Sequence, residues 1–171
     1  MKVEVTGYQE KWDQIFNEES DRIIDIFGDE LIDIHHIGST SVRGLKAKPI
    51  IDMMPIVKQI ENVDLYTAQM AKLGYEALGE FGIKGRRYFR KGGDNRTHQI
   101  HVFQLDNTED IDRHLAVRDY LREHCEDVQR YGDLKENLAR QFPRDIEAYV
   151  NGKDAFVKEL EKNAVHWYDD R

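Results

Sequence analysis

The chain has 171 residues, with 25 Lys and Arg against 33 Asp and Glu, which gives a formal net charge of −8 at pH 7. An acidic surface repels nucleic-acid phosphates, so we expect no binding to duplex DNA, whereas a local basic cleft stays compatible with a small phosphorylated ligand. We also expect a cytoplasmic protein without membrane insertion, because the N-terminus lacks a signal-peptide core, apolar runs are short and Cys125 is the single cysteine.

The predicted elements begin with a helix, because apolar residues recur at helical spacing from Trp12 to Phe27 and Gly28 offers a left-handed end. Four or five β-rich runs follow, with a helical stretch near residues 63–73 after the second. Four are "LIDIHHI", "PIIDMMPIV", "RRYFRK" and "HQIHVFQ", and "YEALG" is a candidate fifth. From Glu109 onward the pattern is helical, with interruptions near Pro143 and Gly152. This order predicts one α+β (mixed α/β) domain over 1–171, with a sheet core at about 30–105 and a C-terminal helical part at about 109–168.

One acid interrupts the apolar strand predicted at residues 49–57. Strand alternation places four side chains on one face: Ile50, Asp52, Met54 and Ile56. An ionised carboxylate there is costly unless it is paired, hydrogen-bonded or bound to a cation, so we expect Asp52 at a strand end that opens on a cleft. Two interpretations remain open: a structural acid that caps a turn or pairs with Lys46 or Lys48, and a phosphate and metal site.

The turn before this strand favours the ligand site. Gly38 lets the backbone approach a ligand closely, and the hydroxyls of Ser39 and Thr40 are suited to phosphate oxygens. The spacing from Gly38 to Lys46 misses the P-loop pattern by one residue, and the sequence contains no G-x-G-x-x-G. The sequence therefore supports neither a P-loop nor a dinucleotide-binding motif.

The segment "HIGSTSVRGLKAKPIIDMMPIV" resembles the signature of the GrpB family, which reads close to H-x-G-S-T-[AS]-V-P-G-L followed by K-P-I-I-D. The similarity continues through "THQIHVF", "VRDYLREH", "YGDLKENLA" and "DIEAYVNGKDAFV", and it covers nearly the whole chain. It implies a nucleotidyltransferase-like fold with a mixed sheet of about five strands and flanking helices. In that fold an h-G-[GS] turn precedes an acid pair D-x-[DE], and Gly38-Ser39 and Asp52 match these landmarks.

The acid set implied by the resemblance is incomplete in this chain. Met54 stands at the second acid position and His101 at the third, so Asp52 and His101 are the expected catalytic residues. Asp52 is also the expected metal ligand, for a divalent ion held weakly as Mg²⁺ or better as Zn²⁺ or Mn²⁺. We expect Met54→Asp to complete an acid pair that faces the cleft. His98 should lie on the opposite strand face from His101.

Basic residues provide further candidate phosphate ligands. Arg43 replaces a proline of the resembled pattern and stands beside the turn, and Lys48 precedes the strand that carries Asp52. Arg118, Lys135 and Lys153 fall in helical stretches that resemble the family, from which they would close a cleft above the "GST" turn. The alternative for each is a solvent-exposed side chain without a role.

The leading functional hypothesis is a nucleotidyltransferase-like domain that binds a nucleotide or a related phosphorylated metabolite near Gly38-Ser39 and Asp52, with catalysis left open. The alternative is a non-catalytic ligand-binding or regulatory module that keeps the fold but lacks the acidic metal cage, and Met54 favours it. The resemblance includes chains in which such a domain is fused to a dephospho-coenzyme A kinase. By analogy, it implies a link to coenzyme A metabolism.

Overall fold

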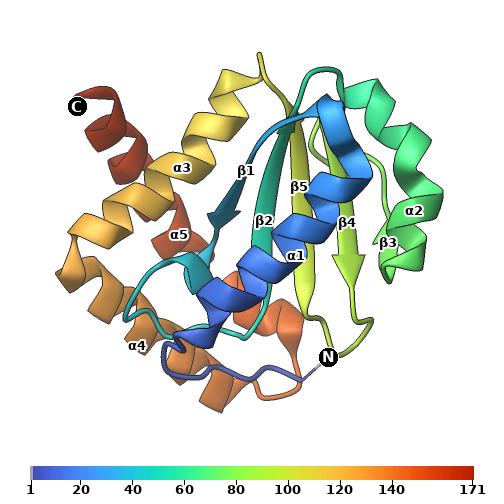
Figure 1. Ribbon diagram of the computed structural model, residues 1–171. Coiled ribbons are helices and arrows are strands. Elements are labelled where there is room, and N and C mark those ends of the chain that lie inside the picture. The colour runs from blue at the N-terminus through green and yellow to red at the C-terminus, as the bar shows by residue number, and fades with distance from the viewer. Residues whose placement is uncertain (1) are drawn as a thin grey trace.

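A five-stranded sheet is the centre of the computed structural model, which describes residues 2–171 (Figure 1). The strands occupy the five predicted places: β1 (Leu31–Ile37), β2 (Ile51–Val57), β3 (Tyr75–Ala77), β4 (Arg86–Lys91) and β5 (His98–Gln104). Their order across the sheet is β1-β2-β5-β4-β3, with β2 and β5 parallel and the other neighbours antiparallel. The mixed sheet confirms the predicted fold class.

Helices lie on both faces of the sheet. The long helix α1 (Lys11–Phe27) crosses one face, and α2 (Thr67–Lys72) lies beside it (Figure 1). The C-terminal helices α3 (Thr108–Glu123), α4 (Cys125–Gln141) and α5 (Ile146–Asp169) pack against one another, and α3 covers the opposite face. Short 3₁₀ segments connect the elements at Gly28–Glu30, Ser39–Ser41 and Ile60–Tyr66. No helix within residues 2–171 is long and apolar enough to cross a membrane.

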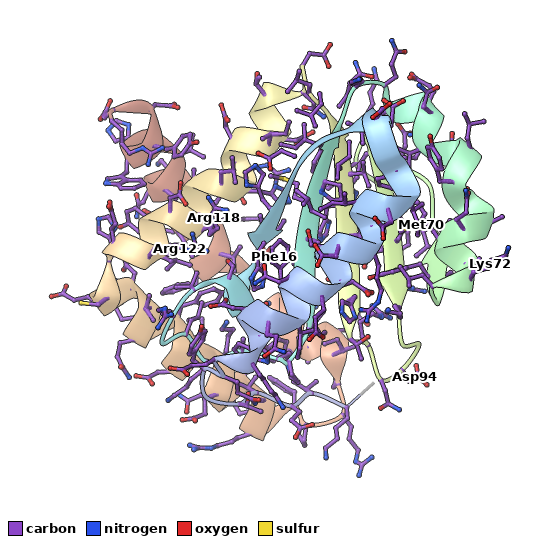
Figure 2. The ribbon with its side chains drawn as sticks, in the orientation of Figure 1. Phe16, Met70, Lys72, Asp94, Arg118 and Arg122 are labelled. Atoms are coloured by element: carbon purple, nitrogen blue, oxygen red, sulfur yellow. The ribbon has the colours of Figure 1, made fainter. Side chains whose placement is uncertain are left out.

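The two faces of β2 bury different parts of the core. Met53 and its face of the strand pack with α1 and with Met70 of α2, which Figure 2 labels. On the other face Met54 is fully buried with Phe103 of β5 and Ile111 of α3. The expectation that Met54 faces the cleft with Asp52 is therefore wrong. Met54 is two residues after Asp52 on the same strand face, and α3 covers that face at Met54.

Gly152 does not interrupt the last helix as predicted. Of the two predicted interruptions only the one near Pro143 occurs, and α5 continues through Gly152 to Asp169; a further break at His124 separates α3 from α4. A Cβ atom at Gly152 would lie 2.5 Å from Cδ2 of Leu138 on α4. The glycine therefore permits the close packing of α4 against α5, which is a long-range requirement that local helix propensity does not express.

Candidate functional site

A tight turn at the end of β1 brings the chain against Asp52. Gly38 adopts φ +74°, and a Cβ atom there would lie 2.7 Å from Oδ2 of Asp52. The Ser41 backbone N–H and hydroxyl both donate to the Gly38 carbonyl, which closes the turn. Glycine is thus required at position 38 both for the backbone conformation and for the approach to Asp52.

Asp52 lies at the start of β2, half-buried, and two side chains of β5 hold it. His101 Nε2 lies 3.1 Å from Asp52 Oδ1. Gln99, with its amide nitrogen turned toward Asp52, donates to the same oxygen at 2.9 Å. Arg86 donates to His101 Nδ1 at 3.2 Å, so the proton of the neutral ring is on Nε2 and is donated to Asp52. Oδ1 is therefore occupied, and Oδ2 faces the turn.

Lys135 reaches the same turn from α4. Its Nζ lies 2.8 Å from the Ser39 hydroxyl and 4.3 Å from the ring centroid of Tyr131, and the residue is only 2% exposed. Burial, and then the charges of Lys153 and Lys48, hold the pKa of Lys135 well below its ordinary value. The lysine is therefore a buried amine that lacks a carboxylate close enough to stabilise its charge.

Two further lysines lie near this turn, and both amines contact the ring of Tyr149 on α5. Lys48 Nζ lies 5.2 Å and Lys153 Nζ 5.1 Å from its centroid. Burial and the charge of Lys48 lower the pKa of Lys153 to about 8, and burial also lowers the pKa of Lys48. The Tyr149 hydroxyl is buried and has no hydrogen-bond partner among the described residues. An unsatisfied buried hydroxyl is destabilising unless a ligand or water completes it.

Together these groups line one cavity of about 130 Å³: Ser39, Lys48, Ile50, Asp52, Gln99, Lys135, Tyr149 and Lys153. Three lysines from three parts of the chain converge there around a single acid. A second, mainly apolar cavity of about 220 Å³ shares Asp52 and is lined by Ile37, Gly38, His101, Arg113, His114, Val117, Val157 and Glu161. Asp52 thus stands between a basic chamber and an apolar one.

The predicted site residues divide into those that meet in the cleft and those that do not. Gly38 and His101 line the apolar cavity, Ser39 and the three lysines line the basic one, and Asp52 belongs to both. Thr40 lines neither: it is 1% exposed, and its hydroxyl donates to the Ile50 carbonyl and contacts His36. The geometry gives no support to the expected Thr40 phosphate contact, because this side chain is buried and bonded within the core.

Three further residues with an expected role or position lie outside the two cavities. Arg43 is exposed and lines neither chamber, so its phosphate contact stays a prediction that the cavity geometry does not support. Arg118 and Arg122, labelled on α3 in Figure 2, donate to the carbonyls of His36 and Ser41. These arginines fasten α3 to the end of β1 and to the turn. His98 lies on the opposite face from His101, as predicted, with its Nε2 3.8 Å from Glu19 on α1.

The donor atoms around Asp52 fit a divalent metal poorly. Both ring nitrogens of His101 are engaged, one with Asp52 and one with Arg86, and Met54 is in the core. Mg²⁺ prefers several hard oxygen ligands, and Asp52 is the one carboxylate among the residues that line the basic cavity. Within residues 2–171 no cluster of three or more His, Cys, Asp or Glu side chains is arranged to hold a metal ion. A weakly bound ion at Asp52 stays a prediction that a metal titration would test.

Sequence reasoning assigned no role to the tyrosines of the site. Tyr131 and Tyr149 each precede a cavity lysine by four residues, in "YGDLK" and "YVNGK". Residues at i and i+4 share a helix face, and each ring lies close to the amine of its lysine. This repeated Y-x-x-x-K spacing is the signal that would have identified both tyrosines.

Comparison with known proteins gives a consistent family. The family model described as "GrpB protein" matches residues 2–163. UPF0157 protein YqkA of Bacillus subtilis is 49% identical over 166 residues, which are 97% of this chain and 48% of that protein. This chain therefore spans about half the length of YqkA. The glutamate-rich protein GrpB of Alkalihalophilus pseudofirmus is 32% identical over 164 residues, covering 93% of this chain and 94% of that protein.

Solved structures agree with the sequence relatives. The crystal structure of conserved protein GrpB from Enterococcus faecalis has a TM-score of 0.94 and 48% identity, over 96% of this chain and 99% of that one. Cid1 poly(U) polymerase with MgGTP bound has a TM-score of 0.53 and 12% identity, over 78% of this chain and 44% of that one. At this identity the likeness shows only a nucleotidyltransferase-like fold.

Proposed function

This chain belongs to the GrpB family, and from that premise and the lysine-lined cavity we propose that it binds a small phosphorylated ligand, a nucleotide or a related metabolite. The convergence of Lys48, Lys135 and Lys153 on one cavity carries the proposal. Within residues 2–171 the ion pairs made by lysines involve Lys46, Lys91 and Lys158 and none of these three. Three amines gathered around one cavity, one buried and two half-buried, repel one another, and a bound polyanion would remove that cost.

Other groups in the cavity favour phosphate over a simple carboxylate ligand. Ser39 lines the cavity, and the Tyr149 hydroxyl, which has no hydrogen-bond partner within residues 2–171, offers a second neutral donor. Hydroxyls and lysines surrounding one small space suit the several oxygens of a phosphate or pyrophosphate group. The neighbouring cavity, with its apolar wall of Val117 and Val157, provides room for the uncharged part of such a metabolite.

One observation favours the non-catalytic alternative, in which the domain binds its ligand as a sensor or regulatory module. Only Asp52 represents the acid set, because the position two residues later is a buried methionine. A metal-dependent phosphoryl or nucleotidyl transfer requires more oxygen ligands than this. The domain would therefore bind the phosphorylated ligand without a metal ion held by the protein, and no metal-dependent step follows.

A thermal-shift screen tests the proposal. The panel contains pyrophosphate, nucleoside triphosphates, dephospho-coenzyme A and coenzyme A, each with and without Mg²⁺, Mn²⁺ and Zn²⁺. A compound held at 100 times its dissociation constant should stabilise the fold by about 2.7 kcal/mol. Lys153→Met should weaken that compound by about 10-fold or more, because a charged hydrogen bond contributes about 1.5–3 kcal/mol.

Lys158 on the same helix provides the matched control. It is exposed and pairs with Asp154, so Lys158→Met should respond to the compound as wild type does. The proposal is wrong if no phosphorylated compound stabilises the protein, or if Lys153→Met and Lys158→Met respond equally. Stabilisation that appears only with a metal would instead support a metal-assisted site at Asp52.

Binding of the phosphorylated compound should take up protons. Because the pKa of Lys153 in the free protein is lowered to about 8, this amine is largely neutral above that pH, and a bound anion restores its charge. The contribution of Lys153 to the affinity should be constant below pH 8. Above pH 8 the affinity should fall by up to about tenfold per pH unit. Calorimetry at pH 8.5 in two buffers of different ionisation enthalpy measures the uptake, and identical heats in both buffers would contradict it.

A further inference from the structure

We infer that Ser39 and Lys135 form a nucleophile and general-base pair, through which the bound phosphorylated ligand transfers a phosphoryl group to the Ser39 hydroxyl. The natural substrate class rests on the proposed function, whereas the pair itself rests on the geometry of the turn and α4. In the transfer the Ser39 Oγ–P bond forms and the bond from phosphorus to the leaving-group oxygen breaks. Lys135 Nζ takes the hydroxyl proton and returns it to the leaving oxygen.

The contact between the two residues has the geometry that such a pair requires. Lys135 Nζ lies 2.8 Å from Ser39 Oγ, within the range for direct proton transfer. Ser39 follows Gly38 in the sharp turn after β1, and it is half-buried on the wall of the cavity. The nucleophile is thus open to a ligand, and its base lines the same cavity while being only 2% exposed.

The surroundings of Lys135 favour the neutral amine that a general base must be. Lys153 from α5 and Lys48 from the segment before β2 both oppose its charge, and Asp52 from β2 favours it. Tyr131, on its own helix, presents a ring to the amine, and burial raises the pKa of this phenol to about 12, so it stays neutral. Burial is the largest cause of the lowered pKa of Lys135, and burial and the two lysines together outweigh the opposing effect of Asp52.

The other hydroxyls of the turn are not equivalent to Ser39. Thr40 donates to the Ile50 carbonyl, and Ser41 donates to the Gly38 carbonyl. Both residues are buried, and neither lines the cavity. Lys48 and Lys153, on the cavity wall, would stabilise negative charge that develops on the phosphoryl oxygens.

Diisopropyl fluorophosphate tests the pair separately from anion binding, because this probe carries no charge. Attack by Ser39 forms the Oγ–P bond and expels fluoride, and Lys135 takes the proton. Intact mass and peptide mapping should find one diisopropylphosphoryl group on Ser39. Ser39→Ala should remain unlabelled.

Two variants of the base separate its chemistry from its charge. Lys135→Met and Lys135→Arg should each slow labelling by about 100-fold or more, since neither side chain accepts the proton. Lys135→Arg keeps a cation and should still be stabilised by the phosphorylated compound of the thermal-shift screen. Lys46, which pairs with Asp133 and Glu136 outside the cavity, provides the control Lys46→Met with unchanged labelling. The wild-type rate should rise with pH and level off well below the ordinary lysine pKa of 10.5.

Each result of the labelling experiment decides the inference. An unlabelled wild type, a label on another residue, or wild-type labelling of a folded Lys135→Arg protein would overturn the nucleophile and base pair. If Ser39 is labelled but no phosphorylated compound binds, the pair stands and the proposed function fails. If such a compound binds while Ser39 stays unreactive, the binding function stands and the inference fails.

Discussion

Met54→Asp should abolish stable folding, with a loss of more than about 4 kcal/mol, instead of creating a metal site. Met54 is fully buried and packs with Ile37, Phe103 and Ile111. A carboxylate there would lose its hydration without gaining a cation, and the core would lose the contacts of the thioether. Domains are stable by only about 5–15 kcal/mol, so the variant should show a greatly lowered melting temperature or no cooperative transition by circular dichroism.

Met54→Leu is the matched control, because it conserves volume and apolarity and should cost less than about 1.5 kcal/mol. Mg²⁺ or Mn²⁺ should not rescue Met54→Asp. A variant that melts close to wild type and gains stability with either ion would contradict the buried position and would restore the interpretation of an acid pair that faces the cleft.

Glu19→Gln should cost about 2–3 kcal/mol, although it removes only one charge. Glu19 of α1 is 1% exposed, and its carboxylate accepts a hydrogen bond from Tyr75 of β3 and pairs with Lys91 of β4. Burial by itself raises the pKa of Glu19, but the bonds from Lys91 and Tyr75 outweigh it and hold that pKa below its ordinary value of 4.5. The ionised network therefore fastens α1 to one edge of the sheet.

Urea denaturation at several pH values measures this effect. Since the pKa of Glu19 is lower in the folded state, its stabilisation is fully present above pH 4.5 and is lost as the pH falls through the folded value. The wild type and Glu19→Gln should therefore converge in acid. Glu18→Gln, at the exposed neighbouring position, should change stability by less than about 0.5 kcal/mol. Equal effects of the two substitutions at pH 7 would show that the buried network contributes nothing.

Part of the candidate site was predictable because the signals are local. Strand alternation separated His101 from His98 on opposite faces of β5. The cost of burying an ionised carboxylate indicated that Asp52 lies at a strand end beside a cleft, and Asp52 lines both cavities there. Glycine at position 38 indicated a turn that approaches another group closely, and the structure places that turn against Asp52. The alternation of side chains along a strand could not distinguish Asp52 from Met54, because both lie on one face of β2. Only the packing of α3 determines that Met54 is buried and Asp52 is not.

The sequence by itself determined the positions of the five strands, the first helix and the family, because each is written in short-range periodicity or in contiguous motifs. Only the tertiary structure decided which basic residues meet. Lys48, Lys135 and Lys153 converge on one cavity, whereas Arg43 faces solvent and Thr40 faces the core. The convergence of the lysines depends on how α4 and α5 pack beside the turn after β1, with Gly152 allowing close contact between the two helices. The packing joins segments about a hundred residues apart, such as Ser39 and Lys135, and a periodic pattern within one segment carries no information about it.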